Sequence, residues 1–186
     1  MSSGLFGGSE LAVTVRRLLL LRHAKSSWDD RDLADHTRPL ALRGRTAAQT
    51  MGQFIKSQGL MPDRVLSSDS CRTRQTAEIV LGIQDRMPSV EWLAGLYLAS
   101  AWQILTIIGE QGGTASSLLV LGHEPGIGVL ANVLAGTGND AERAAMKKKF
   151  PTTSLAIIEF RIDRWLEIAV GEGQLIRFVR PRDLAA

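Results

Sequence analysis

Two arginines and two histidines follow short apolar or serine-containing runs, and they are the residues best suited to chemistry. Arg22 and His23 end the apolar run 18–21, Arg72 comes soon after Ser67 and Ser68, and His123 follows Gly122 at the end of the run 118–121. The arginine guanidinium is a planar fork of donors that matches phosphoryl oxygens. A neutral histidine can act as a nucleophile, and a ring nitrogen can donate a hydrogen bond. These residue types predict a phosphate-binding site.

The elements that must position these residues alternate between apolar runs and amphipathic stretches, which predicts an α/β fold. We expect strands at 13–21, 64–66, 90–93 and 117–121, helices at 42–58, 70–81, 101–109 and 127–134, and a closing antiparallel pair of strands at 153–160 and 165–170. The segment 136–151 gives no clear pattern. Ligands of open α/β sheets bind beyond the carboxyl ends of the strands, so these strand ends are expected to converge on one pocket.

Length and composition favour one domain without a membrane or nucleic-acid role. The chain has 186 residues, a formal charge of +3 and one cysteine, Cys71. We interpret residues 1–12 as a flexible leader and 13–186 as a single domain. The charge is small for a nucleic-acid binder, and the longest apolar run is too short to span a bilayer. A single cysteine suits the reducing cytoplasm.

Three motifs resemble those of the histidine phosphatase superfamily. They are Leu-Arg-His-Ala around His23, Ser-Ser-Asp-Ser-Cys-Arg around Arg72, and Leu-Gly-His-Glu-Pro-Gly around His123. The stretch Thr-Arg-Pro-Leu-x-x-Arg-Gly, which contains Arg38, is similar to the SixA-like phosphohistidine phosphatase subgroup. One such motif is weak, but three in order are specific.

The resemblance implies a phosphoglycerate mutase-like fold, a three-layer α/β/α sandwich with a mostly parallel sheet. It also implies a two-step reaction, in which His23 attacks phosphorus and water then hydrolyses the phosphohistidine intermediate. Arg22, Arg72 and His123 would stabilise charge on the phosphoryl oxygens, with Arg38 and Gly122 contributing to substrate binding. No cofactor or metal is implied, because the arginines supply the positive charge.

The proton donor is the open part of this assignment. Larger superfamily members carry an acid in a region that here reads Glu91 to Tyr97, where none can be placed. Alternatives are Asp29, Asp30, Asp35 and Glu124. A weak acid suits phosphohistidine, because its leaving imidazole can be protonated by solvent, whereas an alkyl phosphate needs more help. A phosphorylated protein is therefore the expected partner, and a small phosphorylated metabolite is the alternative.

Other interpretations carry less weight. The three histidines show no metal-ligand spacing, and His36 is expected to be a surface loop residue. The pattern Gly126-x-Gly128-x-x-Ala131 resembles a dinucleotide fingerprint, but no acidic strand end follows at the required distance, so we expect a helix start that lets the backbone approach phosphate. A phosphate-binding module without turnover is the remaining alternative, and the presence of His23 argues against it. The sequence does not indicate an oligomeric state.

Overall fold

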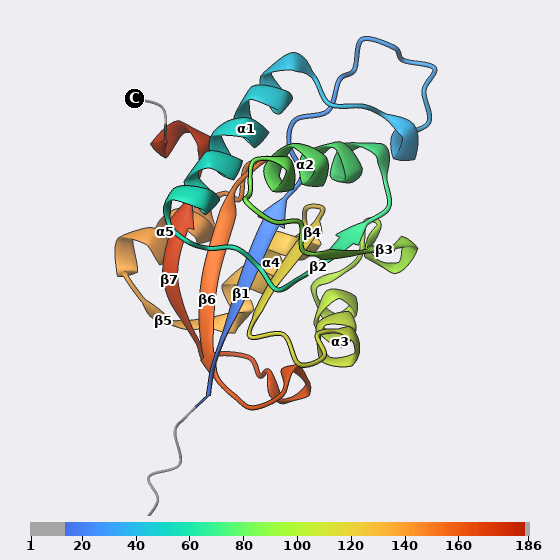
Figure 1. Ribbon diagram of the computed structural model, residues 1–186. Coiled ribbons are helices and arrows are strands. Elements are labelled where there is room, and N and C mark those ends of the chain that lie inside the picture. The colour runs from blue at the N-terminus through green and yellow to red at the C-terminus, as the bar shows by residue number, and fades with distance from the viewer. Residues whose placement is uncertain (1–13, 185–186) are drawn as a thin grey trace, which may run out of the picture.

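The computed structural model describes residues 14–184 and shows one seven-stranded sheet between two layers of helices (Figure 1). The strand order is β3-β2-β4-β1-β6-β7-β5. The strands are β1 (Val15–Arg22), β2 (Arg64–Ser68), β3 (Ser89–Leu93), β4 (Ser117–Gly122), β5 (Ala135–Gly138), β6 (Leu155–Arg161) and β7 (Gly173–Val179). The predicted leader lies outside the described residues.

Most strand pairs are parallel, which confirms the expected sheet. Strands β3, β2, β4 and β1 run parallel to one another, as do β5 and β7, whereas β6 is antiparallel to both of its neighbours. In β1, Leu18 and Leu20 pack into one core cluster and Leu19 and Leu21 into the other. This alternation of fully buried side chains shows that helices cover both faces of the strand.

The helices divide between the two faces. They are α1 (Leu42–Ser57), α2 (Cys71–Gly82), α3 (Ala101–Gln111), α4 (Gly126–Leu134) and α5 (Asp140–Lys148). Buried side chains of α1 and α2, such as Met51 and Val80, join the cluster around Leu19. Those of α3, α4 and α5, such as Ile104, Leu130 and Met146, join the cluster around Leu18. The three-layer architecture predicted from the sequence is therefore confirmed.

The last predicted strand is wrong. Residues 165–170 contain a short 3-10 helix (Trp165–Glu167), and the strand that pairs with β6 is β7. The Trp165 side chain is fully buried, and its indole N–H donates a hydrogen bond of 2.8 Å to the carbonyl oxygen of Ala115. The Trp165 side chain packs against the end of α3 at Gly112. Glycine leaves room for the indole there, because a Cβ at this position would lie 2.4 Å from the ring.

The segment 136–151, which gave no clear pattern, contains most of β5 and all of α5. The Asn139 side chain accepts a hydrogen bond of 3.1 Å from the backbone N–H of Glu142 and so caps α5. Lys147 and Lys148 lie in the last turn of this helix. No helix in the described part of the chain is long and apolar enough to cross a membrane.

Candidate active site

The carboxyl ends of three adjacent parallel strands bring the predicted residues together. In the sheet register Arg22, the last residue of β1, pairs with Gly122, the last residue of β4, and β2 lies on the other side of β4. The backbone N–H of His23 donates to the carbonyl oxygen of Gly122 at 3.1 Å. His23 and His123 therefore follow neighbouring strands, and their ring centroids lie 5.0 Å apart.

The His23 ring has a defined tautomer. Its Nδ1 lies 2.7 Å from the carbonyl oxygen of Ala24. Because a carbonyl only accepts, Nδ1 carries the proton and Nε2 retains its lone pair. The pKa of His23 is lowered from 6.5 to about 4, chiefly by burial and in smaller part by the cations of Arg72 and Arg22. The ring is therefore neutral at pH 7, with no hydrogen bond from a described residue to Nε2.

His123 has the opposite tautomer. Its Nδ1 lies 3.3 Å from Nη2 of Arg72, which can only donate, so Nδ1 is the acceptor. Its Nε2 therefore carries the proton and donates to Oγ of Ser68 at 2.9 Å. Burial lowers the pKa of His123 to about 3, with the neighbouring His23 as the next cause. Ser68 therefore orients this ring.

Arg72 is held in place at the start of α2. Its side chain is 5% exposed, and it donates to the carbonyl oxygen of Asp35 at 2.5 Å and to the carboxylate of Asp35 at 2.9 Å. The Tyr97 hydroxyl donates to the same carboxylate at 2.6 Å. This hydrogen bond is the main reason that the pKa of Asp35 is lowered. Asp35 is thus an ionised partner of Arg72.

Arg22 is held in place at the end of β1. Its Nη1 donates to the carbonyl oxygen of Phe150 at 2.7 Å, whereas its buried Nε has no hydrogen-bond partner among the described residues. Burial lowers the pKa of the guanidinium and the charge of Glu124 opposes this, but an arginine stays protonated at neutral pH.

One cavity of about 420 Å³ contains these groups. Its charged lining residues are Arg22, Lys25, Arg72, Asp35 and Glu124, and both histidines line it as well. Three cations face two carboxylates, so the cavity suits an anion. Ser26, Trp28, Leu98 and Thr152 complete the lining.

The four carboxylates considered as proton donors now separate into two pairs. Asp29 accepts from the hydroxyl of Ser27, and Asp30 accepts from the N–H of Asp32; neither lines the cavity. Asp35 and Glu124 do line it. Burial raises the pKa of Glu124, and its Oε2 is buried without a hydrogen-bond partner among the described residues. Of the two, Glu124 is the better proton donor at neutral pH.

The structure does not bring Arg38 together with the other candidates. Its guanidinium donates to the carbonyl oxygens of Asp30 at 2.9 Å and Arg31 at 3.2 Å. It also stacks on the Trp28 ring, 4.2 Å from the ring centroid. Arg38 is buried outside the cavity lining, where it orders the loop that carries Trp28.

His36 is more than a loop residue. Its Nε2 lies 2.8 Å from the carboxylate of Asp69, and its ring packs edge-on against Tyr97 at 4.8 Å. It therefore supports the tyrosine that holds Asp35. The role of Tyr97 had no sequence signal, because the two partners of its hydrogen bond are 62 positions apart.

The glycines at the start of α4 are in close contact with other parts of the protein. A Cβ at Gly126 would lie 1.9 Å from the carbonyl oxygen of Ala99, and one at Gly128 would lie 2.4 Å from the Glu124 carboxylate. The expectation that these glycines let the backbone approach phosphate is therefore replaced by a packing role. Gly128 also brings its N–H to Glu124, which partly offsets the effect of burial on that carboxyl pKa.

Comparisons with known proteins agree with the site. The family pattern described as "Histidine phosphatase superfamily (branch 1)" matches residues 18–96. An uncharacterized protein of Mycobacterium tuberculosis is 36% identical over 164 residues, which cover 87% of this chain and 100% of that protein.

Solved structures are similar over most of the chain. A protein from Nakamurella multipartitia, provisionally assigned as phosphohistidine phosphatase SixA, has a TM-score of 0.76 and 27% identity, over 90% of this chain and 96% of that one. The α-ribazole phosphatase of Shigella flexneri has a TM-score of 0.62 and 16% identity, over 89% and 96%. The second likeness concerns the fold alone.

Proposed function

The chain belongs to the histidine phosphatase superfamily and is a phosphatase, and we propose that its substrate is phosphohistidine on a protein. One observation carries the mechanism: His23 is a neutral ring whose Nδ1–H is bound to the Ala24 carbonyl, which leaves the Nε2 lone pair for attack. We also propose a cytoplasmic location, which a chain with one cysteine suits.

In the first step Nε2 of His23 attacks phosphorus in line with the leaving group. A bond forms between Nε2 and phosphorus, and the electron pair of the breaking bond goes to the leaving nitrogen or oxygen. Burial favours this step because the ring is already unprotonated at neutral pH, so no proton must be removed first.

Charge on the phosphoryl oxygens is balanced by Arg22 and Arg72. Both guanidinium groups are anchored to backbone carbonyls, those of Phe150 and Asp35. Fixed donors need little reorganisation during the reaction, which is the main source of catalysis in phosphoryl transfer. His123 lies beside Arg72 and offers a further contact, once its Nδ1 takes up a proton.

Glu124 is the proposed proton donor to the leaving group and the base that later activates water. In the second step water attacks the phosphorus of phosphohistidine, the N–P electron pair returns to Nε2 of His23, and phosphate leaves. The raised pKa of Glu124 supports both roles, because a carboxyl group with a pKa closer to neutrality transfers protons in either direction.

Two observations support a protein substrate. The histidine-lined cavity is open to solvent at a rim formed by exposed Trp28 and Leu98, so a side chain on a protein surface can enter. The similar structure from Nakamurella multipartitia is also one assigned to the SixA phosphohistidine phosphatases. A small phosphorylated metabolite is the alternative, since the fold is shared with α-ribazole phosphatase.

The test is phosphate release from a phosphohistidine-bearing protein and from 4-nitrophenyl phosphate, for wild type, His23→Ala and a control, Arg161→Ala, whose side chain lines a separate pocket. We expect wild type and Arg161→Ala to release phosphate from the phosphoprotein, and His23→Ala to release none. Release from the aryl phosphate alone would favour a small phosphorylated metabolite as the substrate. Release from neither would indicate a phosphate-binding module, and full activity of His23→Ala would refute the mechanism.

A further inference from the structure

A groove rich in positive charge lies where the end of α5 meets the C-terminal 3-10 helix (Pro181–Asp183). Its volume is about 650 Å³, and its lining includes Lys148, Lys149, Arg180 and Arg182 but no carboxylate. We call it the basic groove. The whole chain carries a formal charge of +3, so these four side chains alone exceed the net charge of the protein.

Most of this charge is not neutralised within the described residues. Lys148 and Lys149 are exposed and form no ion pair there. Asp183 is held by Arg180 at 2.8 Å, and Arg182 reaches the same carboxylate only at 3.9 Å. Three cations are thus available to a negatively charged partner.

The basic groove adjoins the active-site cavity. Thr152 lines both. The adjacent loop residues are bound to the catalytic strand end: the N–H of Thr153 donates to the carbonyl oxygens of Arg22 and His23, each at 3.1 Å, and the Phe150 carbonyl accepts from Arg22. A partner large enough to cover both cavities can therefore present a phosphoryl group to His23 and contact the basic groove at the same time.

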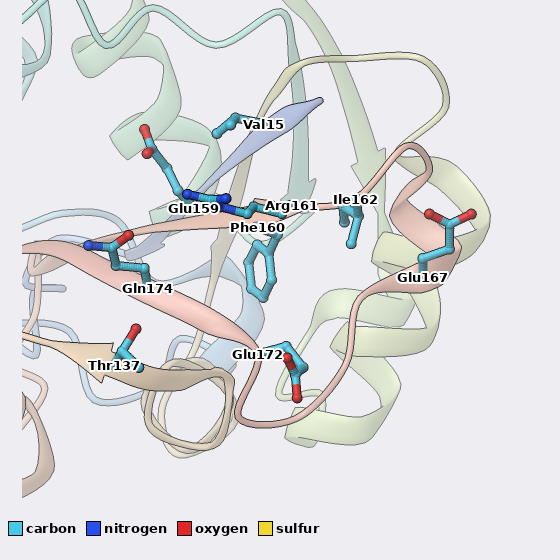
Figure 2. Close-up of a pocket in the computed structure, with 9 residues that line it drawn as sticks. All are labelled: Val15, Thr137, Glu159, Phe160, Arg161, Ile162, Glu167, Glu172 and Gln174. Atoms are coloured by element: carbon cyan, nitrogen blue, oxygen red, sulfur yellow. The ribbon is translucent and has the colours of Figure 1, made fainter. Parts of the chain in front are cut away.

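The opposite end of the sheet has a different character. A pocket of about 370 Å³ there is lined by Glu159, Glu167 and Glu172, with Arg161 as its only cation (Figure 2). Val15, at the start of β1, also lines it. An eight-residue strand rises about 23 Å, so this pocket and Arg22 are separated by roughly that distance along β1. The basic groove and this pocket therefore differ in the sign of the charge that lines them.

We propose that the basic groove is a docking surface for an acidic protein that carries the phosphohistidine, an inference that rests on the proposed function. The cations of the basic groove are mostly long, exposed side chains, and the described lining contains no buried donor aimed into the groove. A small anion is normally held by converging, preorganised donors. Exposed lysines instead attract an extended acidic surface and raise its rate of association.

The test compares Lys148→Glu/Lys149→Glu with Arg86→Glu/Arg161→Glu, which changes the charge equally elsewhere. Both are assayed on an acidic and a basic protein, each phosphorylated on histidine with phosphoramidate, and on 4-nitrophenyl phosphate. On the acidic phosphoprotein at low salt, we expect the groove variant to lose about 10- to 100-fold in kcat/KM. That loss should shrink at 0.5 M salt, because screening shortens the range of the interaction. The control variant and all rates on the aryl phosphate should change little.

Lys148→Ala/Lys149→Ala provides a milder variant, because glutamates at a helix C-terminus also oppose the helix dipole. It should show a smaller loss of the same kind. Equal kcat/KM for wild type and groove variants on the acidic phosphoprotein would overturn the inference. The inference would also be overturned if the groove variants weakened inhibition by free tripolyphosphate by the same factor as they lowered kcat/KM on the acidic phosphoprotein. That result would make the groove a small-anion site. If wild type cleaves only the aryl phosphate, the proposed substrate itself fails.

Discussion

The neutral state of His23 can be tested by its effect on stability. In the folded protein the pKa of His23 is lowered to about 4 by burial, whereas in the unfolded chain it returns to about 6.5. Between these pH values the unfolded chain binds a proton that the folded protein does not. The free energy of unfolding must therefore fall as the pH falls through this interval, and rise again as the pH rises through it, to a full value above pH 6.5.

The size of the effect follows from the same two values. Each pH unit between them changes the free energy of unfolding by about 1.4 kcal/mol for one proton. Over the interval from 6.5 to about 4, His23 alone should destabilise the protein by roughly 3 kcal/mol. Below pH 4 both states are protonated, so its contribution no longer changes.

The assay is urea unfolding from pH 7 to pH 4, for wild type and His23→Gln. Glutamine removes the titrating ring but keeps an amide that can donate to the Ala24 carbonyl. We expect the wild type to lose about 3 kcal/mol more than the variant across this range. NMR titration of the His23 ring in the folded protein should give a midpoint near pH 4.

Parallel stability curves for the two proteins, together with a His23 midpoint near 6.5, would refute the reasoning. They would show that burial and the two arginines do not hold the ring neutral. The nucleophile would then need a base to deprotonate it at pH 6, and the proposed first step would be incomplete.

Three further predictions concern the groups around the nucleophile. Ser68→Ala removes the acceptor that fixes the His123 ring. The loss of this buried hydrogen bond, about 1 to 3 kcal/mol, should lower kcat/KM at least several-fold, and NMR should show a changed His123 tautomer. Glu124→Gln should lower kcat on an alkyl phosphate by about 100-fold and affect phosphohistidine much less; equal losses on both would exclude a proton-donor role. Arg38→Ala should raise KM about 10-fold with little change in kcat, because it releases the Trp28 loop; an equal fall in kcat would instead indicate direct phosphate contact.

The position of the site could be predicted from the sequence because its signals are local. Buried strands appear as apolar runs; Arg22 is the last residue of one such strand and His123 directly follows another. Parallel strands end at the same edge of a sheet, so residues 100 positions apart were expected to meet. The orienting contacts had no such signal. The pairs Ser68–His123 and Asp35–Tyr97 join segments that are 55 and 62 positions apart, and neither hydrogen bond leaves a periodic pattern.

The error at the C-terminus has a similar cause. Trp165 has a high strand propensity, but its side chain packs against Gly112. This contact between distant segments leaves no local sequence pattern. The true strand, β7, does not alternate cleanly between buried and exposed positions. Its pairing with β6 shifts register between Ile157 and Ile158, and such an irregularity breaks the period of two on which strand prediction depends.

The contacts of Arg72 explain how the site can hold an anion without a large rearrangement. Its guanidinium is almost fully buried and anchored to the Asp35 carbonyl, whereas the Asp35 carboxylate is 47% exposed. The carboxylate can therefore turn toward solvent while the carbonyl contact keeps the arginine in place. A phosphoryl oxygen that replaces it at Nη2 also comes close to Nδ1 of His123, since the two nitrogens lie 3.3 Å apart. The added negative charge would raise the pKa of His123 and turn Nδ1 into a donor. Substrate entry thus completes the set of donors.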